Sequence, residues 1–266
     1  MSPDRSEATY VGSAADLALR ALDALRGIEG TATIAEHVEK ADDPRAALAA
    51  IRIVGADAFA PYLFAGAMFH PQDAVAVSQS FEVFPPPVST PDPPPAGPAE
   101  PWIVAWRDWA TTTLLDRFTG ADPSVVPRHG ADPDLDAGTA LVQRPAGAPE
   151  LTEADADADA GTPWQAWSVR MGQLSPLALP GLDGPVHDAA RAAPLPLAQG
   201  ATRAVLRRDF ATAARITRWL ALLAAEGVHV PLDPVPLVDY LGLHGGGARL
   251  ALDVAISRRL LAQEGA

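Results

Sequence analysis

The sequence predicts a mainly α-helical protein, with a helical bundle-like core, long Pro-rich and acidic irregular segments, and little or no strand. Three observations predict it. Apolar residues recur at helical spacing in several stretches that begin and end with capping residues. Proline contributes 27 of 266 residues, about twice its usual share. Acidic residues gather in a segment that is also rich in Gly and Pro.

The N-terminal part, residues 1–84, is predicted to be a series of short helices. Apolar periodicity over residues 13–28 indicates the first, with Ser13 as its N-cap. The sequence TIAE from Thr33 matches a capping box. Asp43, followed by a proline, is typical of a third helix start. We therefore expect three helix starts before the next apolar stretch.

The longest apolar stretch runs from Val54 to Phe69. It contains Asp57 and Pro61, and it is shorter than the ~20 residues that a membrane-spanning helix needs. The polar N-terminal residues do not resemble a secretory signal. We therefore expect a buried helix or helix pair in a cytoplasmic protein that binds no membrane.

Residues 85–101 are predicted to form a Pro-rich connector, because proline fixes its backbone angle and lacks an amide donor. The segment is either a stiff strap or a ligand for a proline-binding groove. A third part, residues 102–266, begins with a helix from about Trp102 to Phe118 and continues into an acidic loop at 119–163. The parts form either one compact domain or two.

The C-terminal residues give the clearest helical pattern. One long helix is predicted over residues 202–227, ending at Gly227, followed by a short helix within 231–247 and a final helix over 248–263. The glycine-rich sequence from Leu243 to Ala248 is either a turn or a loop whose amides receive an anion at the N-terminus of the last helix.

Composition limits the functional classes. There are 33 acidic against 20 basic residues, for a net charge of −13, which argues against nucleic-acid binding. Cysteine is absent, so no disulfide or thiolate site exists. Enrichment in Ala, Pro, Arg and Asp suggests a high-GC bacterial gene. No cofactor and no metal site is predicted.

Tryptophans are clustered in the chain. Trp102, Trp106 and Trp109 fall on one helix face at i, i+4 and i+7. They are either core residues or the wall of a ligand pocket, in which a histidine would supply the polar group. The candidate pocket residues are Trp102, Trp106, Trp109, His70, His187 and His229.

Arginines share one face of the predicted helix 202–227, opposite a continuous apolar face. The face is either simply solvated or binds an anion or acidic partner, because guanidinium groups match carboxylates and phosphates. It could also contact the chain's own acidic segment. The candidate residues are Arg203, Arg207, Arg208, Arg215 and Arg218.

The acidic segment contains Asp155, Asp157 and Asp159 at alternate positions. They match the first three ligand positions of a calcium loop, but the glycine comes one place late and the closing carboxylate is missing. We therefore expect a solvated acidic loop, with the arginine face as its contact within the chain.

No motif in the chain establishes a catalytic class, so the sequence leaves open whether the protein is an enzyme. The first hypothesis is a non-catalytic interaction or accessory protein with a protein partner. The second is an unfamiliar enzyme or small-molecule binder that uses the tryptophan pocket. The third is an anion site on Arg207, Arg215 and Arg218.

Overall fold

The computed structural model describes residues 3–28, 33–87, 89–120, 142–151, 163–244 and 246–262. These residues form helices and connecting segments, without a strand among them. The prediction of a mainly α-helical fold is therefore confirmed.

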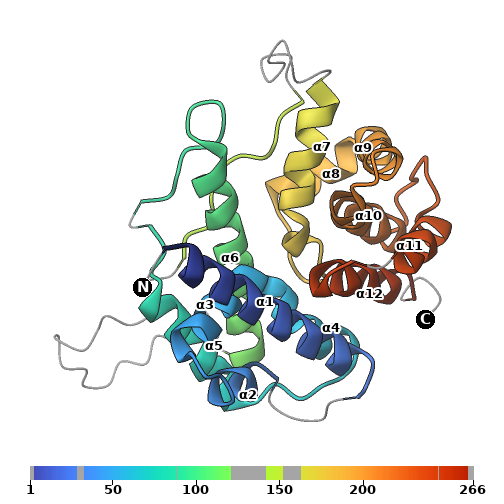
Figure 1. Ribbon diagram of the computed structural model, residues 1–266. Helices are drawn as coiled ribbons and strands as arrows, with labels where there is room; N and C mark the ends of the chain where they lie inside the picture. Colours follow the sequence, from blue (N-terminus) through green and yellow to red (C-terminus); the bar gives the residue numbers. More distant parts are fainter. Residues whose placement is uncertain are drawn as a thin grey trace.

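The first group of helices comes from the N-terminal half and is blue to green in Figure 1. Helix α1 packs against α3, and α6 packs against the short η1. The group comprises α1 (Pro3–Leu25), α2 (Thr33–Glu39), α3 (Pro44–Val54), η1 (Gly55–Phe59), α4 (Ala60–Phe64), α5 (Pro71–Val83) and α6 (Ala99–Thr119).

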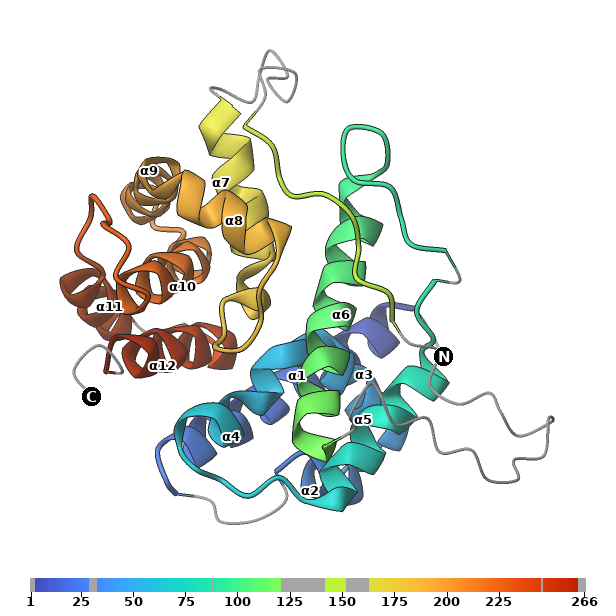
Figure 2. The same ribbon diagram turned by 180° about the vertical axis from the view of Figure 1, so that it is seen from behind.

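The second group is yellow to red and lies beside the first in both views (Figures 1 and 2). Helix α10 is its centre, in contact with α7, α9, α11 and α12, and α12 also packs against α1 of the first group. The group comprises α7 (Pro163–Gln173), η3 (Ser175–Leu177), α8 (Pro185–Ala192), α9 (Pro194–Leu206), α10 (Phe210–Ala225), α11 (Pro234–Leu243) and α12 (Ala248–Ala262).

One hydrophobic cluster runs through both groups. It joins Leu17, Phe59 and Trp106 of the first group to Trp219 and Ile256 of the second, and all five side chains are buried. Burial of apolar area is the main stabilising contribution in such a core, at about 25 cal/mol per Å². The two groups therefore share a core, which fixes the polar side chains that lie between them.

The helix starts of the first group agree only in part with the sequence prediction. Asp43 caps α3 as expected, because its carboxylate accepts from the amides of Arg45 and Ala46. Helix α1, however, begins at Pro3, and the Ser13 hydroxyl bonds to the His37 ring at 3.1 Å instead of capping a helix. Proline followed by acidic residues suits a first helical turn, which explains the earlier start.

Helix α2 receives its cap from another helix. The Asp73 carboxylate, on α5, accepts from the amides of Ile34 and Ala35 at 3.0 and 2.9 Å, and the Tyr62 hydroxyl donates to it at 3.0 Å. Burial, followed by the nearby Asp73 charge, raises the pKa of Tyr62 well above its ordinary value. A capping-box pattern describes contacts within one helix start, so it does not predict this long-range cap.

The predicted helix 202–227 is two helices, which corrects the sequence prediction. Helix α9 ends at Leu206, and α10 begins at Phe210. Asp209 breaks the run because its carboxylate accepts from the Thr212 amide at 3.0 Å and so caps α10. The five arginines therefore do not share one helix face. The predicted end at Gly227 is confirmed, with φ of +75° just beyond α10.

The apolar stretch predicted as a buried helix or helix pair is confirmed for η1 and α4, whereas residues 65–69 are not helical. The run Pro44–Phe64, which includes α3, is long and apolar enough to span a membrane by length and composition, and 78% of its most apolar window is buried inside the fold. Within this fold it is a core element that carries the buried Asp57.

The Pro-rich connector is not helical over the described part of residues 85–98, but α6 begins at Ala99, so Pro101 lies in its first turn. Of the acidic loop, residues 142–151 are described, and they run as an irregular strand-free segment beside α6 toward α7 (Figure 2). The alternating aspartates 155, 157 and 159, with their predicted contact, lie outside the described residues.

Candidate functional site

A buried ion network joins the two groups of helices. Arg218 of α10 has a completely buried side chain, and it donates to both carboxylate oxygens of Asp57 on η1 at 2.9 and 2.6 Å. It also donates to Asp253 of α12 at 2.8 Å. Buried charges are stable only when they are paired and hydrogen-bonded in this way. The network therefore fixes η1, α10 and α12 relative to one another.

Arg249 of α12 extends this network. Its guanidinium bonds to Asp57 and, at 3.3 Å, to Asp253. Burial by itself raises the pKa of Asp57, but Arg218 and Arg249 outweigh burial and hold it below its ordinary value. Asp57 and Asp253 are therefore both paired with Arg218 and Arg249.

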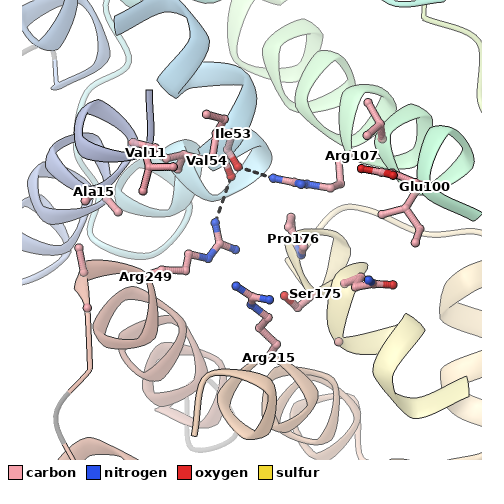
Figure 3. A pocket seen from close by; sticks show the side chains of 18 of the residues that line it. Val11, Ala15, Ile53, Val54, Glu100, Arg107, Ser175, Pro176, Arg215 and Arg249 are labelled. Atoms are coloured by element: carbon pink, nitrogen blue, oxygen red, sulfur yellow. Dashed lines mark hydrogen bonds between the residues drawn. The ribbon is translucent and has the colours of Figure 1, made fainter. Parts of the chain in front are cut away.

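A cavity of about 780 Å³ lies on the outer side of this network, between the two groups of helices. Three arginine side chains from three helices border it: Arg107 of α6, Arg215 of α10 and Arg249 of α12. Their guanidinium groups approach a common space in Figure 3. Together with Arg218 this makes four arginines against two aspartates, so two positive charges remain uncompensated by the network.

The C-terminal end of α3 positions two of these arginines. Arg107 donates to the Ile53 carbonyl, and Arg249 to the Val54 carbonyl at 3.4 Å (Figure 3). The last carbonyls of a helix lack intrahelical partners and carry a partial negative charge, so they attract cations. The end of α3 thus holds both guanidinium groups at the cavity wall.

Arg107 is held in an environment that disfavours its charge. Burial, followed by repulsion from Arg249, lowers the pKa of Arg107 to about 10, although Asp57 and Asp108 partly offset the effect. Its Nε–H is shut off from solvent and has no hydrogen-bond acceptor among the described residues. Part of the side chain nevertheless stays open to the cavity. A buried donor without an acceptor costs roughly 1–3 kcal/mol.

Two further polar groups at the cavity lack partners. Arg215 is half-buried and forms no hydrogen bond or ion pair with the residues that the structure describes. The Ser175 hydroxyl is buried at the start of η3 and likewise has no partner within those ranges. Both face the space bordered by Arg107 (Figure 3). The cavity therefore presents several donors, and the carboxylate among its described lining residues is Glu100, which is exposed at the rim.

The remaining wall is mostly apolar. Helix α1 contributes Val11 and Ala15, and the ends of α3 and α6 contribute Ile53 and Ile103. The N-terminus of α12, at Gly247–Ala248, also borders the space and adds the partial positive charge of a helix start. An anionic group beside an apolar portion matches this arrangement of donors and apolar surface.

The tryptophans predicted to line a ligand pocket lie elsewhere. Trp102 and Trp106 are fully buried and pack edge to face at 6.2 Å, while Trp109 is half-buried. The Trp102 indole donates to the Ala146 carbonyl at 2.9 Å, which ties down the segment after the acidic loop. None of the three borders the arginine-lined cavity.

The predicted histidines are not brought together with the tryptophans at this cavity. His70 stands at the start of α5, His187 is buried on α8, and His229 is exposed after α10. None borders the arginine-lined cavity. Among the described residues, no group of three or more His, Asp or Glu side chains is placed to hold a metal ion.

The predicted arginines are dispersed. Arg218 is buried in the network, and Arg215 borders the main cavity. Arg208 borders a neighbouring cavity, Arg203 a shallow pocket beside α7, and Arg207 is exposed. The sequence thus indicated Arg215 as an anion-binding candidate, but it did not indicate Arg107 or Arg249, because they come from helices distant in sequence.

His187 should make the fold sensitive to mild acid. Its Nε2–H donates to the Leu177 carbonyl at 3.0 Å, and its ring lies edge-on to Trp219. Burial lowers the pKa of His187 from its ordinary 6.5. As pH falls through 6.5, the unfolded chain takes up a proton that the folded state still refuses, so stability falls.

We therefore expect His187→Gln to flatten the dependence of unfolding free energy on pH below 6.5, whereas the exposed His229→Gln should leave the slope unchanged. Urea denaturation at a series of pH values measures both slopes. Equal slopes in wild type and His187→Gln would contradict the assignment.

Comparison with known proteins finds no family model that matches this chain, and neither a curated protein nor a solved structure matches it. The functional argument therefore rests on the arginine-lined cavity itself.

Proposed function

We propose that the protein binds a small organic anion with an apolar portion in the arginine-lined cavity. The observation that carries this proposal is Arg107, a cation with a depressed pKa and a buried Nε–H that has no acceptor within the described residues. An anionic group placed between Arg107 and Arg215 would accept from the part of the Arg107 guanidinium that is open to the cavity, and it would offset the mutual repulsion of the guanidinium groups. The apolar wall from α1 and α6 would cover the rest of the ligand.

Charge and volume favour a small ligand over a large polyanion. The whole chain carries −13, so it repels an extended polyanion at long range. The positive charge is confined to one cavity, whose volume of about 780 Å³ lies in the range of small-molecule sites. Phosphate monoesters and carboxylates with an aliphatic group are the simplest molecules with both features.

Removing the Arg107 guanidinium is expected to weaken the binding of such an anion. Octyl phosphate is a suitable probe, because it combines a phosphate group with an apolar chain. Arg107→Gln should lower its affinity roughly tenfold to a hundredfold, since a hydrogen bond to a charged group contributes about 1.5–3 kcal/mol. Titration calorimetry at low ionic strength measures the affinity, with circular dichroism to confirm folding.

The matched control is Arg207→Gln, which removes the same charge from an exposed side chain that borders neither cavity beside Arg215. It should retain nearly the wild-type affinity. No saturable binding of octyl phosphate by wild type, or an equal loss in both variants, would contradict the proposal. The interaction or accessory role and the cytoplasmic location remain predictions from the sequence.

A further inference from the structure

A second cavity adjoins the first. Its volume is about 320 Å³, and it shares Arg215, Gly247 and Arg249 with the larger cavity. Arg208, at the junction of α9 and α10, borders the second cavity but not the first. Arg215 and Arg249 thus border both cavities, whereas Arg107 borders the larger one alone and Arg208 the smaller one alone.

The backbone of Arg208 is in a conformation that disfavours any side chain. Its φ is +59°, the left-handed region, and Arg208 is the sole non-glycine residue with positive φ among the described residues. The Arg208 and Asp209 amides donate to the carbonyls of Val205 and Ala204, each at 2.9 Å. This is the hydrogen-bond pattern that closes a helix with glycine at its first residue beyond the cap.

The same chain shows how that position is ordinarily filled. Helix α10 closes with the same pair of bonds, from Gly227 to Ala224 and from Val228 to Leu223, and there the left-handed residue is glycine. A side chain at this position is unfavourable because Cβ approaches the following carbonyl. Arg208 therefore occupies a place where glycine would fit better, and strain of this kind is often retained at binding sites.

The acidic groups around Arg208 are already engaged. Asp209 accepts from the Thr212 amide to cap α10, and Asp253 accepts from Arg218 and Arg249. Within the described residues the Arg208 guanidinium has no acceptor of its own. Arg208 is exposed to solvent at the edge of the second cavity, next to the two guanidinium groups that this cavity shares with the first.

We infer that Arg208 forms a second anion subsite, and that the ligand is an organic diphosphate with an apolar group. This inference rests on the proposed function of the larger cavity. One phosphate group lies between Arg107 and Arg215, and the second lies next to it beside Arg208, where Arg215 and Arg249 border both cavities. A planar guanidinium offers donors along two edges, so a shared arginine can bridge adjacent phosphates. The apolar group lies against α1 and α6 in the larger cavity.

The test compares octyl phosphate with octyl diphosphate by titration calorimetry on the full chain. Wild type should bind the diphosphate about tenfold more tightly or better, as one added charge-assisted contact implies. Arg208→Gly should abolish most of this preference and leave the octyl phosphate affinity unchanged. The melting temperature of ligand-free Arg208→Gly should rise, because glycine relieves the left-handed strain.

Arg207→Gln is again the matched control, since it removes a neighbouring exposed charge and should keep the preference for diphosphate. If wild type binds octyl phosphate but prefers the diphosphate no more than Arg208→Gly does, the second subsite is refuted while the proposed function stands. If Arg208→Gly and Arg207→Gln lose the preference for diphosphate equally, the effect is long-range charge and the subsite is also refuted. If neither probe binds, the proposed function itself fails.

Discussion

Replacing Asp57 with asparagine is expected to lower the free energy of unfolding by about 3–5 kcal/mol. Asp57 is completely buried and accepts two hydrogen bonds from Arg218, whose side chain is equally buried. Without the carboxylate charge, Arg218 keeps Asp253 as its one anionic partner among the described residues, and Arg249 competes for that partner. An uncompensated charge in a core is far more costly than a lost surface contact.

The matched control is Asp183→Asn, which breaks an exposed ion pair with Arg191 at 2.9 Å. Exposed pairs contribute at most about 1 kcal/mol, so this variant should be nearly as stable as wild type. Urea denaturation at neutral pH gives both values. A loss of 1 kcal/mol or less for Asp57→Asn would show that the buried network does not hold the two groups of helices together.

Replacing Arg215 with methionine is expected to have opposite effects on the ligand-free and ligand-bound protein. Methionine keeps the apolar stem and removes a charge that repels Arg107 and has no acceptor in the described part of the chain. The ligand-free protein should therefore become more stable, by on the order of 1 kcal/mol. The affinity for octyl phosphate should fall roughly tenfold to a hundredfold, because a direct charged contact is lost.

Thermal unfolding with and without octyl phosphate measures both effects in one experiment, since a ligand stabilises the state that binds it. Arg207→Met serves as the control, because that side chain is exposed and outside both cavities. A variant Arg215→Met that is less stable than wild type without ligand would indicate a structural role for Arg215. Such a result would contradict the claim that the Arg215 charge destabilises the ligand-free protein.

Sequence patterns predict a helix end correctly where the capping contacts come from neighbouring residues. Asp43 caps α3 through its own neighbouring amides, and Gly227 closes α10 through bonds within the same turn. Where the decisive contact came from a distant residue, local patterns failed. Asp73 on α5 caps α2, which no neighbouring sequence reveals.

The break between α9 and α10 has a local sequence signal, but the helical periodicity on both sides of it is stronger. Asp209 precedes Thr212 at the spacing of an N-cap, but the apolar period continues across the junction at nearly helical phase. The expectation of a single arginine face followed from that continuity. In the structure, the turn sends Arg208 and Arg215 toward cavities and Arg218 into the core.

The cavity could not be assembled from sequence, because its residues come from helices far apart in the chain. Arg107 lies on the helix that carries Trp102, Trp106 and Trp109, and Arg249 follows a glycine-rich turn. Among the sequence-based hypotheses, anion binding near the start of the last helix comes nearest to the site, because Gly247 and Ala248 border the cavity.

The Nε–H resonance of Arg107 in a nitrogen-15 NMR spectrum tests the central claim most directly. The signal is assigned by its disappearance in Arg107→Gln. An anion bound to the open part of the same guanidinium changes the surroundings of this buried donor, so on addition of octyl phosphate the Nε–H signal should shift and saturate with the affinity that calorimetry measures. An unchanged Arg107 resonance, with shifts confined to exposed arginines such as Arg207, would contradict the account.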